Sequence, residues 1–248
     1  MQESYPPSPC QRAPRELLKA NGADWLDGYL EQVLTRDASL TVGRDPVRMG
    51  RYFEAAALNT AVVVEHKKLY DAAQINRKTA TDYDQLLLNL FLIDHVPPWT
   101  SNRLSRLIDR PKRYLTDASL LAAALRLDVA GILRDGDLHG RTLDTFVAAQ
   151  LRPEIAYSPR RPRPYHLRDA NGRHEIDLLV ELGGNEFVAL EIKASATPTR
   201  ADARHLLWLR DQLGERFLAG AVLHTRPRPF VIDDRVFAVP IAAFWSNS

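Results

Sequence analysis

The sequence has little of what several protein classes require. Its 248 residues include one cysteine, Cys10, so an internal disulfide is excluded and a reducing compartment is expected. The seven histidines show no paired spacing of the kind that Cys/His metal sites use. No Gly-x-x-x-x-Gly-Lys-Ser/Thr motif occurs, so we expect no ATP site of the Walker type.

Long apolar segments are missing as well. The longest apolar runs, residues 55–64 and 86–93, are much shorter than the ~20 residues that cross a bilayer. Residues 1–23 contain several prolines but no secretory apolar core, and we expect them to form a loose leader. The net charge is only +2, so the chain as a whole is not strongly cationic. These absences indicate a cytoplasmic protein that does not associate with membranes.

Acidic residues are concentrated in two short segments that a glycine turn separates. If residues 183–185 form a hairpin loop, Leu182 lies opposite Glu186 and Asp177 lies opposite Glu191. Directly paired residues have Cβ atoms roughly 5 Å apart, so these carboxylates and Lys193 would converge on one face of the hairpin. Side-chain alternation makes the other face apolar, with Ile176, Leu178 and Val180 on the first strand.

Two carboxylates so close together repel each other unless a cation lies between them. Mg²⁺, or Mn²⁺ in its place, is the ion such oxygen ligands favour. It would polarise a phosphodiester and activate water, while Lys193 would orient the water or stabilise developing charge. The alternative is a solvated strand face on which Glu191 and Lys193 form an ordinary surface pair.

The order of Asp177, a hairpin and Glu191-x-Lys193 resembles the PD-(D/E)xK nuclease superfamily. The amphipathic segment 142–151 resembles the first helix of that core, and Asp144 stands where many members have an additional acidic residue. The resemblance implies that Asp177 and Glu191 are metal ligands and that Lys193 and Asp144 complete a catalytic set.

Downstream segments fit the same core. We expect a helix over residues 202–213, a buried strand over 218–224 and a last strand over 236–241. With the hairpin and the upstream helix, they indicate a restriction-endonuclease-like core with a mixed sheet.

The N-terminal part has helical periodicity. Helices are expected over residues 24–35, 47–64, 67–74 and 78–90. The last two, joined by a turn at 75–77, have the layout of a helix-turn-helix, whose second helix offers polar side chains to the DNA major groove. The residues in that position are Arg77, Lys78, Thr79 and Thr81.

Segments 91–96 and 103–115 could add the hairpin of a winged helix. The alternative is a small helical bundle or a winged helix that contacts only proteins. Asp82 and Asp84 on the second helix oppose phosphate attraction, which dominates affinity for DNA.

A basic segment lies between the helix expected over residues 142–151 and the acidic hairpin. Arginines alternate with prolines and aromatics between residues 152 and 173, which suits a phosphate-lined groove with base stacking. The alternative is an exposed loop kept soluble by its charge. The residues concerned are Arg160, Arg161, Arg163, Arg168 and Arg173, with Tyr157 and Tyr165.

Turn-forming residues at 134–140 mark the expected domain boundary. A short helix over 120–127 precedes it. The chain is then α/β (α+β): a leader at 1–23, a helical winged-helix region at 24–133 and a nuclease-like domain at 140–248.

Three motifs together resemble domain-of-unknown-function family 4143, whose members usually form the C-terminal half of an AAA+-type ATPase. They are residues 75–87, residues 111–120 and the acidic hairpin. The middle motif resembles the family's Pro-Lys-x-Tyr-x-x-Asp-x-Gly-Leu signature, with Ser119 where glycine is usual. The resemblance covers residues 29–242 and implies a winged helix followed by a nuclease-like domain. Because no P-loop is present, we expect either a truncated member or one whose motor is a separate polypeptide.

Three functions follow. The first is a nucleic-acid-binding module on a nuclease-like platform, with DNA as the ligand that the helix-turn-helix favours. The second is an active Mg²⁺-dependent nuclease that hydrolyses phosphodiesters. The third is a regulatory module that contacts a separate AAA+-type ATPase or another protein through outer apolar residues such as Trp99, Trp208, Phe244 and Trp245.

Overall fold

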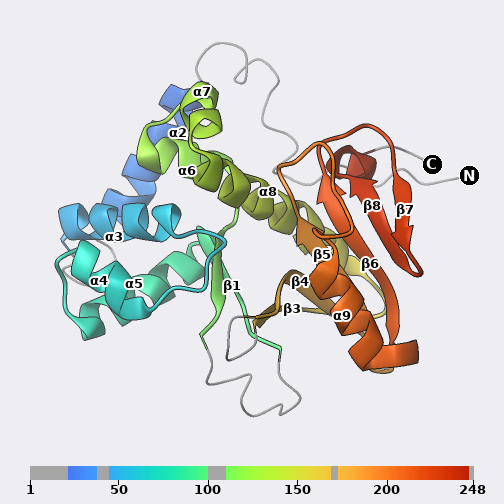
Figure 1. The fold of residues 1–248 in the computed structure, drawn as a ribbon. Helices are drawn as coiled ribbons and strands as arrows, with labels where there is room; N and C mark the ends of the chain where they lie inside the picture. The colour runs from blue at the N-terminus through green and yellow to red at the C-terminus, as the bar shows by residue number, and fades with distance from the viewer. Residues whose placement is uncertain (1–21, 38–44, 100–109, 169–172, 246–248) are drawn as a thin grey trace, which may run out of the picture.

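The structure is a computed structural model that describes residues 22–37, 45–99, 110–168 and 173–245. A helical region and a mixed β-sheet occupy opposite sides of the molecule (Figure 1). The long helix α8 (Gly136–Tyr157) and a two-stranded sheet, β1 (Ile93–Val96) with β2 (Lys112–Leu115), lie between them. The predicted order of a helical part followed by a sheet core is confirmed.

The helical region follows the predicted periodicity. Its elements are α2 (Gly22–Glu31), the π-helix η2 (Gln32–Asp37), α3 (Pro46–Leu58), α4 (His66–Ala72), α5 (Arg77–Asn89), α6 (Ser119–Leu125) and α7 (Val129–Arg134). Side-chain caps begin α3, α5 and α7, where Asp45 accepts the Val47 N–H, Asn76 the Thr79 N–H and Asp128 the Gly131 N–H. The helix predicted over residues 47–64 is too long, because α3 ends at Leu58 and the Ala61 N–H donates to the Arg113 carbonyl of β2.

The turn conformation predicted for residues 134–140 is wrong, because residues 136–140 are helical. Only Asp135 separates α7 from α8, and its carboxylate caps α8 by accepting the N–H groups of Asp137 and Leu138. The Asp135 cap stabilises the start of the helix, although Gly136 and Gly140 favour turns in the absence of such a cap. Arg141 in α8 donates to the Leu58 carbonyl, so the beginning of α8 is fastened to the helical region.

The main sheet has six strands in the order β3-β4-β5-β6-β8-β7. The antiparallel pairs are β3/β4, β4/β5 and β7/β8, and the parallel pairs are β5/β6 and β6/β8. The strands are β3 (Arg163–Arg168), β4 (Glu175–Leu182), β5 (Glu186–Ile192), β6 (Phe217–His224), β7 (Phe230–Asp233) and β8 (Val236–Pro240). Helix α9 (Arg204–Leu213) and the 3₁₀ turn η4 (Gly214–Arg216) precede β6, and η5 (Ile241–Trp245) follows β8.

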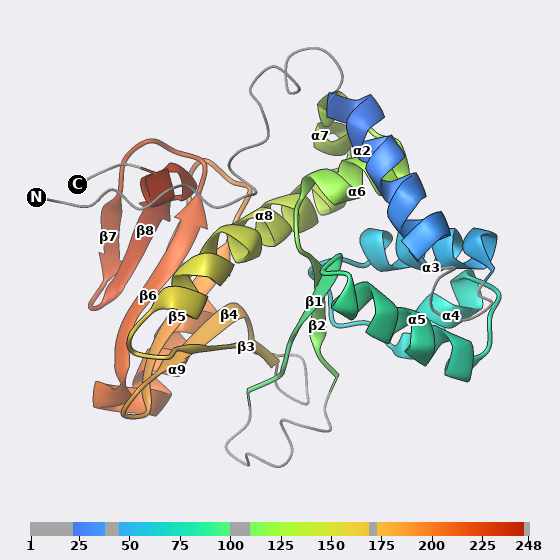
Figure 2. The ribbon, with the colours of Figure 1, turned by 180° about the vertical axis from the view of Figure 1, so that it is seen from behind.

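Both faces of the hairpin are buried, which corrects the prediction of one apolar and one polar face. Helix α8 covers one face, as the rear view shows (Figure 2), and α9 covers the other. Leu178, Val180 and Leu190 pack on the α8 side, whereas Leu179 packs on the α9 side. Ile176, predicted to share a face with Leu178, lies on the α9 side, because a register shift between β3 and β4 changes the alternation.

Strands β3 and β7 were not predicted. Pro162 and Pro164 concealed β3, yet proline is tolerated on an edge strand such as this one. The two strands form the two edges of the sheet. In the part of the chain that the structure describes, no helix combines the length and the apolar character that a membrane crossing needs.

Candidate functional site

Three carboxylates and a lysine converge where α8 passes the sheet. The predicted hairpin register is confirmed, since Leu182 pairs with Glu186 and Leu178 with Leu190. One position further, the Ile192 N–H donates to Asp177 Oδ2 at 2.9 Å. Helix α8 brings Asp144 to the same place, where Asp144 and Asp177 accept hydrogen bonds from one shared donor.

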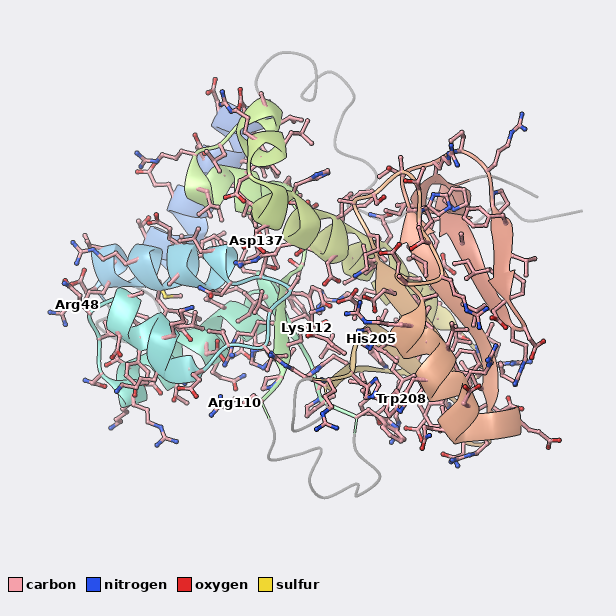
Figure 3. All side chains as sticks on the ribbon, in the orientation of Figure 1. Arg48, Arg110, Lys112, Asp137, His205 and Trp208 are labelled. Atoms are coloured by element: carbon pink, nitrogen blue, oxygen red, sulfur yellow. The ribbon has the colours of Figure 1, made fainter. Side chains whose placement is uncertain are left out.

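That shared donor is Lys112, which the sequence did not identify as a site residue. Its ammonium Nζ lies 2.7 Å from Asp144 Oδ2 and 3.0 Å from Asp177 Oδ1. The residue is only 2% exposed, and it lies at the seam between the helical region and the sheet (Figure 3). Its strand, β2, belongs to the helical half of the chain. The alternation of Lys112 and Tyr114 along β2 is the signal that could have revealed both residues.

Tyr114 completes the hydrogen bonding of Asp144. The Tyr114 hydroxyl donates to Asp144 Oδ1 at 3.0 Å, so both oxygens of this carboxylate have a donor. Burial raises the pKa of Asp144 to about 6, against the opposing effect of the Lys112 charge. Burial acts in the same direction on Asp177, but the Lys112 ammonium and the Ile192 N–H outweigh it and lower the pKa of that carboxyl.

Glu191 is the least satisfied member of the group. Lys193 donates to its Oε1 at 2.7 Å, whereas Oε2 is buried without a hydrogen-bond partner. Burial, together with the Asp177 charge, raises the pKa of Glu191 to about 8. Glu191 is 6% exposed, so the alternative of a solvated Glu–Lys surface pair is wrong for Glu191.

The arrangement does not accommodate a divalent ion. Five of the six oxygens of these carboxylates already accept a hydrogen bond, counting two each on Asp144 and Asp177 and one on Glu191. The Lys112 ammonium occupies the space between the two aspartates that a bridging Mg²⁺ would need. Among the described residues, no group of three or more His, Cys, Asp or Glu side chains is placed to hold a metal ion. Asp144, Asp177 and Glu191 are therefore neighbours, but not assembled ligands.

The opposite side of β2 carries a second buried charge cluster. Arg113 binds Asp84 of α5 through Nε at 3.2 Å and an Nη nitrogen at 3.3 Å. Asp84 also accepts from the Tyr52 hydroxyl at 3.0 Å and pairs with His95 at 3.2 Å. Burial would raise the pKa of Asp84, but the bonds from His95 and Arg113 lower it far below the usual range. Asp84 is therefore an internal ion partner, and its charge does not oppose phosphate at the surface.

The beginning of α5 is exposed as the helix-turn-helix prediction requires. Arg77, Lys78 and Thr81 have exposed side chains in the first turns of the helix. Thr79 is half-buried and donates its N–H to the Asn76 cap. The two strands β1 and β2 then follow; residues 103–109 of the predicted hairpin lie outside the described residues.

The predicted basic groove is divided between the two ends of the hairpin. Arg163 pairs with Glu181 and the Arg160 carbonyl lies near Gly183, so these arginines lie beside the β4–β5 turn, away from Asp177. At the other end, Arg168 pairs with Glu175. All five arginines are exposed: Arg160, Arg161, Arg163, Arg168 and Arg173. Among the aromatics, Tyr157 is exposed, but Tyr165 is buried in the core, so the prediction that Tyr165 stacks on bases is wrong.

A histidine pair on the α9 side was also missed, because its members are far apart in the sequence. His174 Nδ1 lies 3.5 Å from His205 Nδ1, and the His174 ring stacks on Trp208 with centroids 3.9 Å apart. His205 and Trp208 both lie on α9 (Figure 3). Trp99 and Trp208, which were expected on outer faces, pack against the core on the α9 side. Phe244 is 39% exposed, and the Trp245 side chain lies outside the described residues.

Comparison with protein families divides the chain at the beginning of α8. Residues 139–244 match the family model of DUF4143, a domain of unknown function. Residues 10–130 match a different model, that of DUF8612, also a domain of unknown function. The DUF4143 match is thus shorter than the expected 29–242, and the motif at residues 111–120 lies in the DUF8612 match.

The acidic centre joins the two matched regions. Asp144, Asp177 and Glu191 belong to the DUF4143 region, whereas Lys112 and Tyr114 belong to the DUF8612 region.

Ser119 begins α6 without a positive φ angle, so the departure from the expected glycine causes no strain. No curated protein matches the chain. No solved structure matches it either.

Proposed function

We propose that this chain is a nucleic-acid-binding protein, with duplex DNA as its ligand, whose nuclease-like centre does not cleave while Lys112 is bound there. The observation that carries the proposal is the exposed start of α5. Arg77, Lys78 and Thr81 project from the first turns of a helix whose Asn76 cap follows a short connection from α4. Of the two acids on this helix, Asp84 is buried and neutralised, whereas Asp82 is exposed.

The order of the elements supports this assignment. Helices α4 and α5 followed by the strands β1 and β2 correspond to a helix-turn-helix with a wing. In that module the beginning of the second helix enters the major groove. The helix N-terminus adds a partial positive charge toward phosphate. Arg77 and Lys78 would therefore contact phosphates or base edges, and Thr79 and Thr81 would lie beside them.

The second group of cations extends the surface. Arg160, Arg161 and Arg163 are exposed beside the β4–β5 turn, and Arg173 is exposed next to β4. Phosphate contacts are additive to a first approximation and do not depend on base sequence. We assign these arginines to backbone contacts, with the specific contacts left to α5.

Binding of a fluorescein-labelled 30-base-pair duplex, measured by fluorescence anisotropy across a salt series, tests the proposal. Arg77→Ala/Lys78→Ala should weaken binding and reduce the slope of log K against log salt by about 2. The matched control is Arg134→Ala/Arg216→Ala, which removes two exposed cations from α7 and η4. Equal effects of the two pairs, or no binding by wild type at low salt, would contradict the proposal.

An active Mg²⁺-dependent nuclease is the second candidate. Its supporting observation is the convergence of Asp144, Asp177 and Glu191, with Lys193 bonded to Glu191 and one Glu191 oxygen left without a partner. If the ammonium of Lys112 left the centre, Asp177 and Glu191 would supply metal ligands, and Lys193 would supply the positive charge beside them. Mg²⁺-dependent cleavage by wild type that Asp177→Asn abolishes would favour this candidate over the first.

A further inference from the structure

Among the described residues, Lys112 is the lysine or arginine with the smallest exposed fraction. Its ammonium is bonded to Asp144 and Asp177 and is almost completely buried. A lone lysine on a helix or strand surface would keep its ammonium in water, since removing a charge from water is strongly unfavourable. The two carboxylates offset that cost, and they raise the pKa of Lys112 well above its ordinary value although burial acts in the opposite direction.

A divalent ion and the Lys112 ammonium would compete for one position. A bridging Mg²⁺ needs oxygen ligands at about 2.0–2.1 Å from its centre, whereas the ammonium nitrogen stands 2.7 and 3.0 Å from the two aspartates. Two cations cannot share this space, because a divalent ion and an ammonium so close together in a buried site repel each other strongly.

The backbone that carries Lys112 is held in place by its neighbours. Its strand is fixed on both sides, since the next residue, Arg113, binds Asp84 on α5 and the following one, Tyr114, binds Asp144. The Leu115 N–H donates to Thr60 Oγ1 at 3.0 Å. The position of Lys112 therefore depends on how β2 packs against the helical region.

A third observation points to a ligand that would replace Lys112. Glu191 Oε2 is buried beside the same centre and has no hydrogen-bond partner. A buried polar oxygen without a partner is unfavourable, because it has lost its hydration and gained no hydrogen bond in return. A divalent cation between Asp177 and Glu191 would give Glu191 Oε2 a partner.

We propose that Lys112 is an internal cation that excludes divalent metal from the acidic centre, so that the helical region holds the centre closed. Metal binds only when the Lys112 ammonium is removed or withdrawn with β2. The inference concerns the acidic centre alone and holds whether or not the chain binds nucleic acid. A negative DNA-binding result would leave it standing, and a negative metal result would leave DNA binding standing.

The test is isothermal titration calorimetry, in which Mn²⁺ is titrated into the full chain and its affinity is measured. Wild type should bind Mn²⁺ weakly. Lys112→Met should bind one ion at least about tenfold more tightly, and Lys112→Met/Asp177→Asn should lose that gain. Lys68→Met is the matched control, because Lys68 is exposed on α4 and far in sequence from the centre. It should bind Mn²⁺ as wild type does.

A second variant covers the case in which Lys112→Met does not fold. Lys112→Gln keeps an N–H donor toward the aspartates but removes the charge. It should also bind Mn²⁺ more tightly than wild type, and its melting temperature should rise with Mn²⁺ while that of wild type stays constant. Two results would overturn the proposal: wild type that binds Mn²⁺ as tightly as the variants at a site dependent on Asp177, or a folded Lys112→Gln that binds no better than wild type.

Discussion

Lys112 and Arg113 are consecutive residues whose side chains bind carboxylates in different halves of the molecule. Lys112 binds Asp144 of α8 and Asp177 of β4, and Arg113 binds Asp84 of α5. Strand alternation sends the two side chains to opposite faces of β2. This short strand therefore joins α5, the proposed DNA-reading helix, to the acidic centre by three buried ion pairs.

Removing Arg113 should be strongly destabilising. Arg113→Met leaves Asp84 buried with His95 and Tyr52 as its remaining partners, and we expect a loss of roughly 3 kcal/mol in the free energy of unfolding. Urea unfolding followed by circular dichroism measures it. Arg113→Met/Asp84→Asn should recover part of the loss, since no unpaired charge remains. A double variant no more stable than the single one would argue against the ion pair as the cause.

Thr60 should contribute more to the free energy of unfolding than a core threonine whose hydroxyl makes no buried hydrogen bond to another element. Its Oγ1 accepts the Leu115 N–H and lies 2.9 Å from Thr145 Oγ1 of α8. Thr60→Val keeps the shape but leaves both groups without a partner, which should cost about 1–3 kcal/mol. Thr60→Ser keeps the hydroxyl and is the matched control in the same urea experiment. Equal stabilities of the Val and Ser variants would remove the hydrogen bonds from the explanation.

Glu191 should make the protein less stable as pH rises. The folded pKa of about 8 exceeds the ordinary value of 4.5, because burial and the Asp177 charge disfavour the carboxylate. Above pH 4.5 the unfolded chain releases this proton while the folded chain keeps it, so stability falls between pH 4.5 and 8. Glu191→Gln should abolish this decline and exceed wild type at pH 8 by roughly 1–3 kcal/mol.

The control for that profile is Glu186→Gln, which neutralises another glutamate of β5 at the opposite end of the strand. Its pH profile should run parallel to that of wild type. A Glu191→Gln profile that also declines from pH 4.5 to 8 would show that another group carries the effect. Asp144, whose pKa burial raises to about 6, would be the first such group to examine.

The arginines beside the β4–β5 turn should contribute to affinity but not to sequence preference. Arg160→Ala/Arg161→Ala should weaken binding of two unrelated duplexes by similar factors and reduce the salt slope by about 2. Anisotropy with both duplexes measures this. Arg77→Ala/Lys78→Ala should change the ratio of the two affinities, because α5 is the proposed base-reading element. Identical behaviour of the two pairs would contradict this division.

Local patterns in the sequence were sufficient to predict many of the helices and strands. The helical periodicity before and within α5 and the glycine turn between β4 and β5 determined those elements, and the hairpin register followed from the turn. Alternation also brought Asp177 toward Glu191. These features depend on neighbours in sequence, so a single sequence contains them.

The remaining features depend on contacts between distant residues. Lys112 lies 32 positions before Asp144 and 65 before Asp177. Its alternation with Tyr114 along β2 could have marked it as a site residue, but not as the partner of these two aspartates. The same applies to His174 and His205 and to the burial of Tyr165. The start of α8 was missed for another reason: glycines indicated a turn, but the Asp135 cap and the contact of Arg141 with Leu58 stabilise a helix there.

The most direct test of the account is incubation of wild-type protein with supercoiled plasmid and Mg²⁺, with each sample divided between two gels. One half is loaded directly and the other after proteinase digestion. We expect a retarded plasmid on the first gel, because the protein binds DNA. We expect intact supercoiled plasmid on the second gel, because Lys112 keeps metal out of the acidic centre. An unretarded plasmid, or nicked and linear plasmid that Asp177→Asn prevents, would contradict it.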